Sequence, residues 1–513
     1  MTASADNAAS YFVDRHVGEG RGAKCAYREA GSGRTLSYAD LAEGSARVAG
    51  ALLRAGIRPE ERAAMLVLDT IEFPQIFFGA LKAGVVPVPL NTLLATPVYD
   101  AILRDSRAAV LFVSASLWET VAPAASQSPC LRQIIVLGGD TVPEGARGLD
   151  AFLDGAEAIE TAPASPDEIA FWLYSSGSTG APKGVHHVHS SLRATADSYG
   201  AQVLGIREDD TVLSAAKLFF AYGLGNAMTF PLSVGATTVL FAGRPTPVDM
   251  IANLEAERPT IFCGVPTLYA AMVAQMDRTG VPQVPLRRCI SAGEALPEDI
   301  GTRWRAHTGV DILDGVGSTE MLHIFLSNRA GEVVYGTSGL PVPGYAVRLL
   351  DEEGREVGNN EVGELLVNGA SAAGGYWNQR AKSRATFEGV WTRTGDKYER
   401  RPDGRYVYCG RTDDMFKVSG IWVSPFEVEQ ALTSHRAVLE AAVVPARDAD
   451  GLEKPKAFIV LDGADASGIE EALKDHVKAR IGKWKYPRWI EVVDDLPKTA
   501  TGKIQRFKLR ENA

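Results

Sequence analysis

The sequence predicts an α/β protein with a large N-terminal domain of βαβ subdomains, a small β subdomain and a small α+β C-terminal domain. Three observations support this prediction. The chain has 513 residues, which is long enough for two or three domains. Short β-branched runs alternate with helical patterns through about the first 330 residues, as in βαβ units. From about Gly336 the pattern changes to short strands between glycine-rich turns.

The first part of the chain alternates strand-like and helix-like segments. Strands are expected at 63–70, 85–90 and 109–115, with helices at 71–84 and 98–108 between them. Further strands are expected at 237–241, 260–265, 288–293 and 310–317. Nearly continuous apolar strands of this kind are typical of parallel sheets that are buried on both faces. Ligands of such sheets bind at the carboxyl ends of the strands, so we expect the site there.

The second part predicts a β subdomain and a compact tail. Strands are expected at 344–357, 363–369 and 404–410, followed by a turn with a charge cluster at 410–420. The tail then carries two expected strands, at 441–446 and 457–462, and a helix at 469–481. We place a domain boundary at this turn, which divides the chain into residues 1–412 and 413–513.

Composition narrows the class of protein. Hydrophobic residues make up 46% and charged residues 23% of the chain, which is typical of a globular protein. The formal net charge of −10 argues against nucleic acid as a partner, because a phosphate-binding surface needs a basic excess. From Arg411 onward the chain carries 17 basic and 17 acidic residues, so the acidic excess lies in the preceding part.

The cysteines and the apolar segments predict a reduced, cytoplasmic protein. The five cysteines are odd in number and widely spaced, so neither a disulfide framework nor a CxxC zinc site is indicated. The N-terminus has no basic and apolar leader of the secretory type. The longest apolar stretch, 75–90, is interrupted by Lys82, Gly84 and two prolines, so no membrane span is expected.

The segment YSSGSTGAPKGV, residues 174–185, predicts an anion-binding loop. Clustered glycine, serine and threonine let backbone N–H groups and hydroxyls approach an anion closely, and Lys183 supplies a positive charge. The segment is not a Walker A motif, because Lys183 is followed by Gly184 and not by serine or threonine. A helix is expected directly after the loop, where His186, His187 and His189 are read as structural and not as metal ligands.

This loop resembles the phosphate-binding loop of the adenylate-forming superfamily, which includes acyl- and aryl-CoA synthetases, peptide-synthetase adenylation domains and luciferases. Five further stretches match that family in order: SAGEALP, DGVGSTE, GGYWN, TRTGD with GRTDDMFKVSG, and PKTATGKIQR. The resemblance implies that a carboxylate attacks the α-phosphate of ATP to give an acyl adenylate and pyrophosphate. A thiol then displaces AMP.

The resemblance also implies roles for individual residues. The matching ATP positions are Ser175, Ser176, Gly177, Ser178, Thr179, Gly180 and Lys183 for the phosphates, Gly293, Glu294, Ala295, Asp314, Gly315 and Val316 for adenine, and Asp396 and Arg411 for the ribose. Thr319 would contact the α-phosphate, and Glu320 would bind Mg²⁺. Many relatives carry an aromatic residue at Val316, so base stacking should be weaker or displaced.

The C-terminal part matches the family's moving elements. Lys503 matches the lysine that enters the active site during adenylation, and Lys498 is expected to be structural. Asp413 matches the hinge about which the small domain turns, whereas Asp403 and Asp414 are expected to be plain turn acids. Residues 417–422 would face the active site after the turn, with Lys417, Gly420 and Trp422 near CoA.

Within the superfamily the chain is most similar to the benzoate and hydroxybenzoate CoA ligases. The residues that match the acyl-binding positions are Phe220, Ala221, Tyr222, Gly223, Val316, Gly317 and His323. They predict a narrow, flat, mostly apolar pocket for an aromatic ring, in which His323 contacts either the carboxylate or a ring substituent or is a satisfied neighbour.

Three alternatives stay open. The nearest is a stand-alone aryl adenylation enzyme that loads a carrier-protein thiol. A phosphoryl-transferring P-loop NTPase and a non-catalytic nucleotide-binding relative fit the motifs less well. The expected ligands are an aromatic carboxylate, ATP, Mg²⁺ and CoA, without nucleic acid or membrane, in a monomer or a homodimer.

Overall fold

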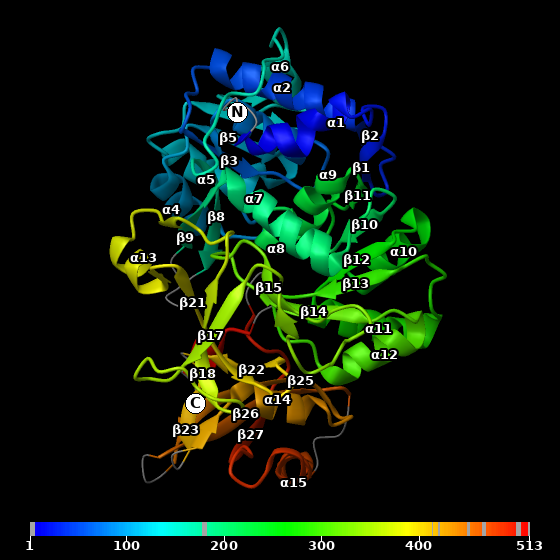
Figure 1. Ribbon diagram of the computed structural model, residues 1–513, viewed down its shortest axis with the longest axis vertical. Helices are drawn as coiled ribbons and strands as arrows, with labels where there is room; N and C mark the ends of the chain where they lie inside the picture. Colours follow the sequence, from blue (N-terminus) through cyan, green and yellow to red (C-terminus); the bar gives the residue numbers. More distant parts are fainter. Residues whose placement is uncertain are drawn as a thin grey trace.

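A computed structural model describes residues 6–176, 182–412, 414–418, 421–448, 452–463, 468–498 and 504–510. The N-terminal sheets and their helices form one end of the molecule, and the C-terminal domain forms the other (Figure 1). The antiparallel strands of the β subdomain lie between them (Figure 1). The predicted α/β class with a small α+β domain after a large N-terminal domain is confirmed.

A mixed nine-stranded sheet runs through the N-terminal domain in the order β16-β15-β14-β13-β12-β10-β11-β1-β2. Its strands are β1 Cys25–Glu29, β2 Thr35–Ser37, β10 Thr211–Ser214, β11 Thr237–Leu240, β12 Ile261–Gly264, β13 Arg288–Ser291, β14 Ile312–Gly317, β15 Ile324–Ser327 and β16 Leu340–Pro341. The six strands from β14 to β1 in this order are parallel to their neighbours, whereas β2, β15 and β16 pair antiparallel. The carboxyl ends of β12, β13 and β14 therefore meet at one edge.

A second, fully parallel sheet has the order β4-β3-β5-β6-β7. Its strands are β3 Arg62–Leu66, β4 Val86–Pro89, β5 Val110–Ser114, β6 Gln133–Leu137 and β7 Arg147–Gly148, connected by helices α3 Glu72–Lys82, α4 Thr96–Ser106 and α5 Trp118–Gln127. Every residue of β4 and β5 is buried, which explains their continuous apolar sequences. The strands and helices predicted in this part of the chain are confirmed.

The remaining helices cover these sheets or connect them. Their bounds are α1 Arg15–Gly18, α2 Tyr38–Arg54, α6 Leu149–Leu153, α7 His189–Thr195, α8 Ala221–Leu224, α9 Phe230–Val234, α10 Pro247–Glu257, α11 Pro266–Thr279, α12 Glu298–Thr308 and α13 Arg380–Thr386, with π-helical turns η2 Ser10–Asp14, η4 Ala196–Leu204 and η5 Gly225–Thr229 and the 3₁₀ turn η3 Ala115–Leu117. Helix α2 begins with a capping box, in which Ser37 and Asp40 satisfy each other's backbone N–H groups.

The predicted β subdomain is present and forms an antiparallel sheet. It consists of β17 Ala346–Leu350, β18 Val362–Asn368, β20 Phe387–Glu388, β21 Trp391–Arg400 and β22 Tyr406–Arg411. A separate three-stranded sheet combines β8 Ile169–Ser176 and β9 Pro182–Val188 with the distant β19 Gly375–Tyr376. This third sheet connects the glycine-rich loop to the GGYWN motif.

The C-terminal domain has its own hydrophobic core, whose first member in the chain is Phe416. Its elements are β23 Phe416–Val418, β24 Ile421–Val423, α14 Pro425–Thr433, β25 Val438–Arg447, β26 Glu453–Leu461, α15 Ile469–Ile481, β27 Trp489–Val492 and α16 Arg506–Arg510. The predicted tail strands and helix are confirmed. The boundary between residues 412 and 413 stays a prediction.

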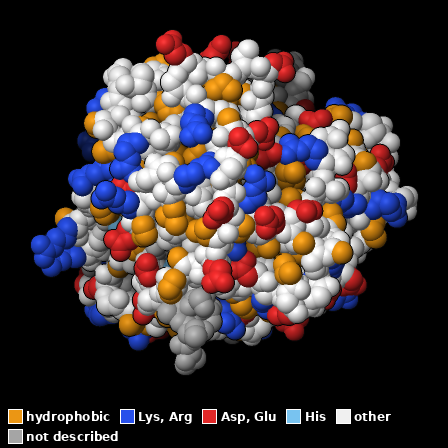
Figure 2. All heavy atoms as spheres, turned by 90° about the horizontal axis from the view of Figure 1, so that it is seen from above, with side chains coloured by type: hydrophobic (Ala, Val, Ile, Leu, Met, Phe, Trp, Pro, Cys, Tyr) orange, Lys and Arg blue, Asp and Glu red, His pale blue; other side chains and the backbone are white. Residues whose placement is uncertain are grey.

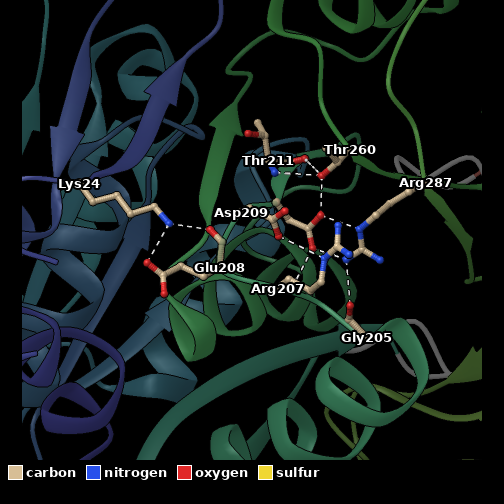
Figure 3. A network of polar contacts seen from close by, with 9 residues as sticks. Lys24, Gly205, Arg207, Glu208, Asp209, Thr211, Thr260 and Arg287 are labelled. Atoms are coloured by element: carbon tan, nitrogen blue, oxygen red, sulfur yellow. Dashed lines mark hydrogen bonds and ion pairs between the residues drawn. The ribbon is translucent and has the colours of Figure 1, made fainter.

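A buried polar network, made of an ion pair and a threonine hydrogen bond, joins the starts of three parallel strands (Figure 3). The Asp210 carboxylate precedes β10, has no exposed side-chain surface and receives two hydrogen bonds from Arg287, which precedes β13. Thr260, which precedes β12, donates a further hydrogen bond of 2.7 Å to Asp210. The network lies at the amino ends of these strands, opposite the edge where ligands are expected.

The surface carries charges of both signs. On the face seen in Figure 2, lysine and arginine side chains are interspersed with acidic and apolar ones. Within the described part of the chain, no helix combines the length and the apolar character needed to cross a membrane.

Candidate active site

The glycine-rich loop connects the two strands of an antiparallel hairpin. Strands β8 and β9 pair so that Ser175 lies opposite Lys183. The Ser175 hydroxyl is buried and has no hydrogen-bond partner among the described residues. Gly177, Ser178, Thr179 and Gly180, together with the Ser176 side chain, lie outside the described part of the structure.

The prediction of a helix directly after the loop is wrong. Residues 182–188 form β9, and α7 begins only at His189. The reason is strand pairing: β9 is the central strand of its sheet and pairs with the neighbouring β8 on one side and with the distant β19 on the other. His187 and His189 are buried and His186 is partly buried, and this burial lowers the pKa of each to about 4, so they are neutral. No group of three potential metal-binding side chains was found among the described residues.

Lys183 and Glu320 approach each other at the end of this hairpin. The Lys183 Nζ lies 3.9 Å from Glu320 Oε1, and only 13% and 16% of the two side chains are exposed. Burial lowers the pKa of Lys183, although the nearby Glu320 carboxylate opposes this shift. The Tyr376 hydroxyl donates a 2.7 Å hydrogen bond to the same Glu320 oxygen. One cation and one carboxylate are thus available at the mouth of the phosphate loop.

A tight turn presents Glu320 on one side and His323 on the other. Leu322 within it has a positive φ of 65°, which is costly for a side chain with a Cβ and is typical of functional sites. The backbone carbonyl of Thr319 accepts a 2.8 Å hydrogen bond from His187 Nε2, so His187 anchors this turn to β9. The turn therefore places the predicted phosphate-binding and acyl-binding residues next to each other.

The predicted adenine residues gather at the carboxyl ends of β13 and β14. Asp314, Gly315 and Val316 belong to β14, while Gly293, Glu294 and Ala295 follow β13. Asp314 is buried, and desolvation raises its pKa to about 8; its Oδ1 has no partner among the described atoms. Gly315 is required by packing, because a Cβ there would lie 2.6 Å from the Leu326 carbonyl oxygen.

Two residues from the C-terminal domain close this adenine region. A cavity of about 10 Å³, enough for one water, is lined by both domains. Its walls are Ala295, Leu296, Asp314, Gly336, Thr337, Ser338 and Tyr408 from the N-terminal side and Phe426 and Gln430 from α14. The Tyr408 and Phe426 rings contact edge to face, 5.2 Å apart.

The predicted ribose contacts are paired across two neighbouring strands. Asp396 on β21 lies opposite Arg411 on β22, and Arg411 Nη1 lies 3.0 Å from Asp396 Oδ1. Gly395 before the aspartate has a positive φ of 72°, which brings the backbone close to the guanidinium. A ribose hydroxyl would therefore meet a carboxylate whose orientation is already set.

The His323 imidazole lies among three aromatic rings, of which Tyr222 belongs to the predicted acyl residues and Tyr199 and Phe230 do not. Tyr222 at the start of α8 stacks on it with ring centroids 5.8 Å apart, and Tyr199 and Phe230 enclose it at 5.0 and 4.6 Å. Burial lowers the pKa of His323 to about 3, so the ring is neutral. Neither ring nitrogen has a partner among the described residues. His323 is thus an unused polar group in an aromatic enclosure.

The other predicted acyl residues differ in what they can offer a ligand. The Tyr222 hydroxyl donates to the backbone carbonyl oxygens of Gly264 and Ile290, each at 3.1 Å. A Cβ on Gly223 would lie 2.0 Å from the Lys217 carbonyl oxygen, so this glycine is required for packing. Gly317 is equally confined, because its Cβ would lie 2.5 Å from the His323 carbonyl oxygen. Phe220 precedes α8 and packs on Phe219.

Several predictions on the C-terminal side fall outside the described residues. These are Lys503, Asp413 and Gly420, together with the side chains of Lys417 and Trp422, whose backbones pair in the β23–β24 hairpin. Their roles stay predictions. Lys498, expected to be structural, forms ion pairs with Glu440 and Asp495.

The expectation for Asp414 is wrong. Its side chain is only 18% exposed and is bridged by Arg506 and Arg510 from the end of the chain. Arg506 also forms a bidentate pair with Glu429 on α14. Asp414 is therefore the centre of a charge network that ties α16 to the start of the C-terminal domain. Asp403, by contrast, accepts a hydrogen bond from Arg405 N in a turn, as expected.

Tyr376 is a site residue outside the predicted set. Its signal in the sequence is the GGYWN motif, in which it is the central residue. The pairing of β19 with β9 is what brings this tyrosine to Lys183.

Comparison with known proteins identifies the family. The family described as "AMP-binding enzyme" matches residues 13–377, and the one described as "AMP-binding enzyme C-terminal domain" matches residues 427–503. The chain is 55% identical to a 4-hydroxybenzoate–CoA/benzoate–CoA ligase of Rhodopseudomonas palustris over 98% of this chain and 94% of that protein. It is 56% identical to a benzoate–CoA ligase of Thauera aromatica over 98% and 95%.

A solved structure gives the same result at the level of the fold. The benzoate CoA ligase of Burkholderia xenovorans LB400 superposes with a TM-score of 0.90 at 51% identity, covering 98% of this chain and 99% of that one. The resemblance inferred from six motifs is confirmed. The chain belongs to the AMP-binding enzyme family.

Proposed function

We propose that this protein is an ATP-dependent CoA ligase for aromatic carboxylic acids of the benzoate or hydroxybenzoate type. The observation that carries the proposal is the similarity of 55% and 56% over almost the whole chain to ligases named for these acids. In the first step a carboxylate oxygen bonds to the α-phosphorus of ATP and pyrophosphate leaves. In the second step the sulfur of CoA, having lost its proton, bonds to the acyl carbon and AMP leaves.

The first step brings two anions together, so the site must supply positive charge and aligned donors. Lys183 and Ser175, whose hydroxyl has no hydrogen-bond partner among the described residues, flank the loop assigned to the β- and γ-phosphates. Lys503 would bring a second cation to the reacting carboxylate and α-phosphate. Asp396 and Arg411 would hold the ribose.

The donor set fits Mg²⁺. This ion usually binds proteins through one or two carboxylates and takes its other ligands from water and substrate phosphates. Glu320 offers such a carboxylate beside the phosphate loop, with one oxygen outside the hydrogen bond from Tyr376. When bound, Mg²⁺ would neutralise phosphate charge.

The residues assigned to the acyl site suit an aromatic acid. Tyr199, Tyr222 and Phe230 surround His323 with flat apolar faces. A planar ring needs no ordering of a flexible chain on binding, which favours it in such an enclosure. The neutral imidazole could hydrogen-bond the acid carboxylate or a ring substituent.

The acceptor thiol is the less constrained part of the proposal. The C-terminal segment from Arg411 has no net charge, unlike the acidic remainder, and this suits the phosphates of CoA. The second candidate is a phosphopantetheine thiol on a carrier protein. Aromatic-acid-dependent AMP release with free CoA supports the CoA ligase. Turnover only with a loaded carrier protein would replace it by the second candidate.

The role of Lys503 gives the sharpest test of the mechanism. Lys503→Ala should nearly abolish adenylate formation, because a charge that acts mainly in the transition state is lost. It should spare thioester formation from pre-made benzoyl adenylate. Lys498→Ala is the matched control, since Lys498 is held by Glu440 and Asp495. Equal loss of both half-reactions in the Lys503 variant would contradict the assignment.

A further inference from the structure

Tyr376 stands at the meeting point of the two charged groups of the nucleotide site. Its strand β19 pairs with β9, where Tyr376 lies opposite Val185, two residues after Lys183. The next residue, Trp377, donates its backbone N–H to the Gly184 carbonyl at 2.8 Å. On the other side, the Ala373 N–H donates to the Glu320 carbonyl at 2.8 Å. Backbone hydrogen bonds thus fix this segment to Glu320 and to Gly184, the residue after Lys183.

The phenol contacts both charges. Its hydroxyl donates to Glu320 Oε1 at 2.7 Å, and its ring lies beneath the Lys183 ammonium, 4.8 Å from Nζ to the ring centroid. A hydroxyl-to-carboxylate bond and a cation–π contact are each stronger in a half-buried site than in water. The ring is itself held by Phe387 at 5.3 Å, and its backbone N–H donates to Ser383 Oγ at 3.0 Å.

The separation between the two charges is the unusual feature. Lys183 Nζ and Glu320 Oε1 are 3.9 Å apart, although a direct charge-assisted hydrogen bond between such groups is normally about 2.7–2.9 Å. The Tyr376 hydroxyl donates its hydrogen bond to Glu320 Oε1, the carboxylate oxygen from which the distance to Lys183 is measured. The opposite charges are therefore close but do not form a direct hydrogen bond.

We infer that Tyr376 is a positioning residue that holds Glu320 in one orientation and prevents a closed ion pair between Glu320 and Lys183. This inference rests on the proposed function, in which Lys183 binds phosphate and Glu320 binds Mg²⁺. A closed pair would have to break before the nucleotide could bind. The open arrangement leaves the ammonium for phosphate and one carboxylate oxygen for the cation.

The test is a double-mutant cycle on nucleotide binding. Tyr376→Phe removes only the hydroxyl and keeps the ring beneath Lys183. Isothermal titration calorimetry of the full chain should show about a tenfold rise in the Kd of MgATP, which corresponds to about 1.4 kcal/mol. In a Glu320→Gln background, Tyr376→Phe should raise the Kd of MgATP less than twofold, because the charged partner of the hydroxyl is gone.

A matched control separates positioning from general loss of a tyrosine hydroxyl. Tyr335→Phe removes a hydroxyl that donates to Asp311 at 3.0 Å, outside the nucleotide site, and should leave the Kd of MgATP unchanged. Thermal midpoints of all variants check that each is folded. A second titration measures ATP binding in the presence of EDTA and without Mg²⁺. Tyr376→Phe should still weaken ATP binding there, because Lys183 would be paired with Glu320 and less available to the phosphates.

The outcomes are distinguishable. If Tyr376→Phe binds MgATP within twofold of the wild type, the positioning role is refuted while the proposed function stands. Additive effects in the Glu320→Gln background would also refute it, since they would mean that the hydroxyl acts independently of the carboxylate. If the wild type neither binds MgATP nor releases AMP with benzoate and CoA, the proposed function itself fails.

Discussion

Asp314 should make the stability of this protein depend on pH in an unusual direction. Its carboxyl is buried at the end of β14, and desolvation raises its pKa from 3.8 to about 8. In the unfolded chain this group is ionised above about pH 3.8, whereas in the folded protein it keeps its proton up to about pH 8. The unfolded state therefore binds fewer protons, and the free energy of unfolding falls as the pH rises between these values.

The size of the effect follows from the two pKa values. One pH unit within this window costs about 1.4 kcal/mol, so the penalty is about 2 kcal/mol at pH 5.5 and about 4 kcal/mol at pH 7. Asp314→Asn keeps the shape but removes the titration. Its stability relative to the wild type should therefore improve by about 2 kcal/mol between pH 5.5 and pH 7 and become constant above about pH 8.

Urea unfolding of both proteins between pH 5.5 and 8.5 measures this difference. Neighbouring Tyr199, Tyr222 and Tyr398 do not titrate in this range, because burial raises their pKa values. Asp403→Asn is the control: Arg405 lowers the pKa of Asp403, so its difference from the wild type should be flat. A stability gap for Asp314→Asn that does not change with pH would refute the reasoning.

Two further predictions concern stability and the acyl pocket. Arg287→Met leaves the Asp210 carboxylate buried without its partner, which should cost about 3–5 kcal/mol in urea unfolding at pH 7 without changing kcat/KM per folded molecule. Hydrogen bonds from Arg287 lower the pKa of Asp210 in the folded protein. The stabilisation is therefore present above about pH 3.8 and is lost as the pH falls through the lowered pKa of the folded state. An Arg287→Met variant as stable as the wild type would contradict a stabilising role of this ion pair. Ala221→Phe should raise KM for benzoate severalfold while the Kd of ATP stays unchanged, and an unchanged KM would exclude Ala221 from the acyl pocket.

The alternating segments of the N-terminal domain could be predicted because their information is local. Strands β3, β4 and β5 are short apolar runs, and the helices between them have their own periodicity. The same holds for α15, whose bounds Ile469–Ile481 match the expected helix. The family could also be inferred from sequence, since six motifs in order carry it.

What the sequence did not reveal depends on partners far along the chain. Residues 182–188 became a strand because they pair with β8 in a hairpin and, on the other side, with β19, almost two hundred residues later. Asp414 became a network centre because Arg506 and Arg510 return to it from the end of the chain. Tyr376 reaches Glu320 and Lys183 only through this pairing.

The sequence by itself determined most of the elements, the family and the types of side chain at the candidate site. The tertiary structure decided which charges meet, at what distance and with how much burial. The physical reason is that periodicity and turn chemistry act over a few residues, whereas hydrogen bonds across sheets and desolvation depend on the packing of the whole fold. The 3.9 Å gap between Lys183 and Glu320 and the raised pKa of Asp314 are consequences of that packing.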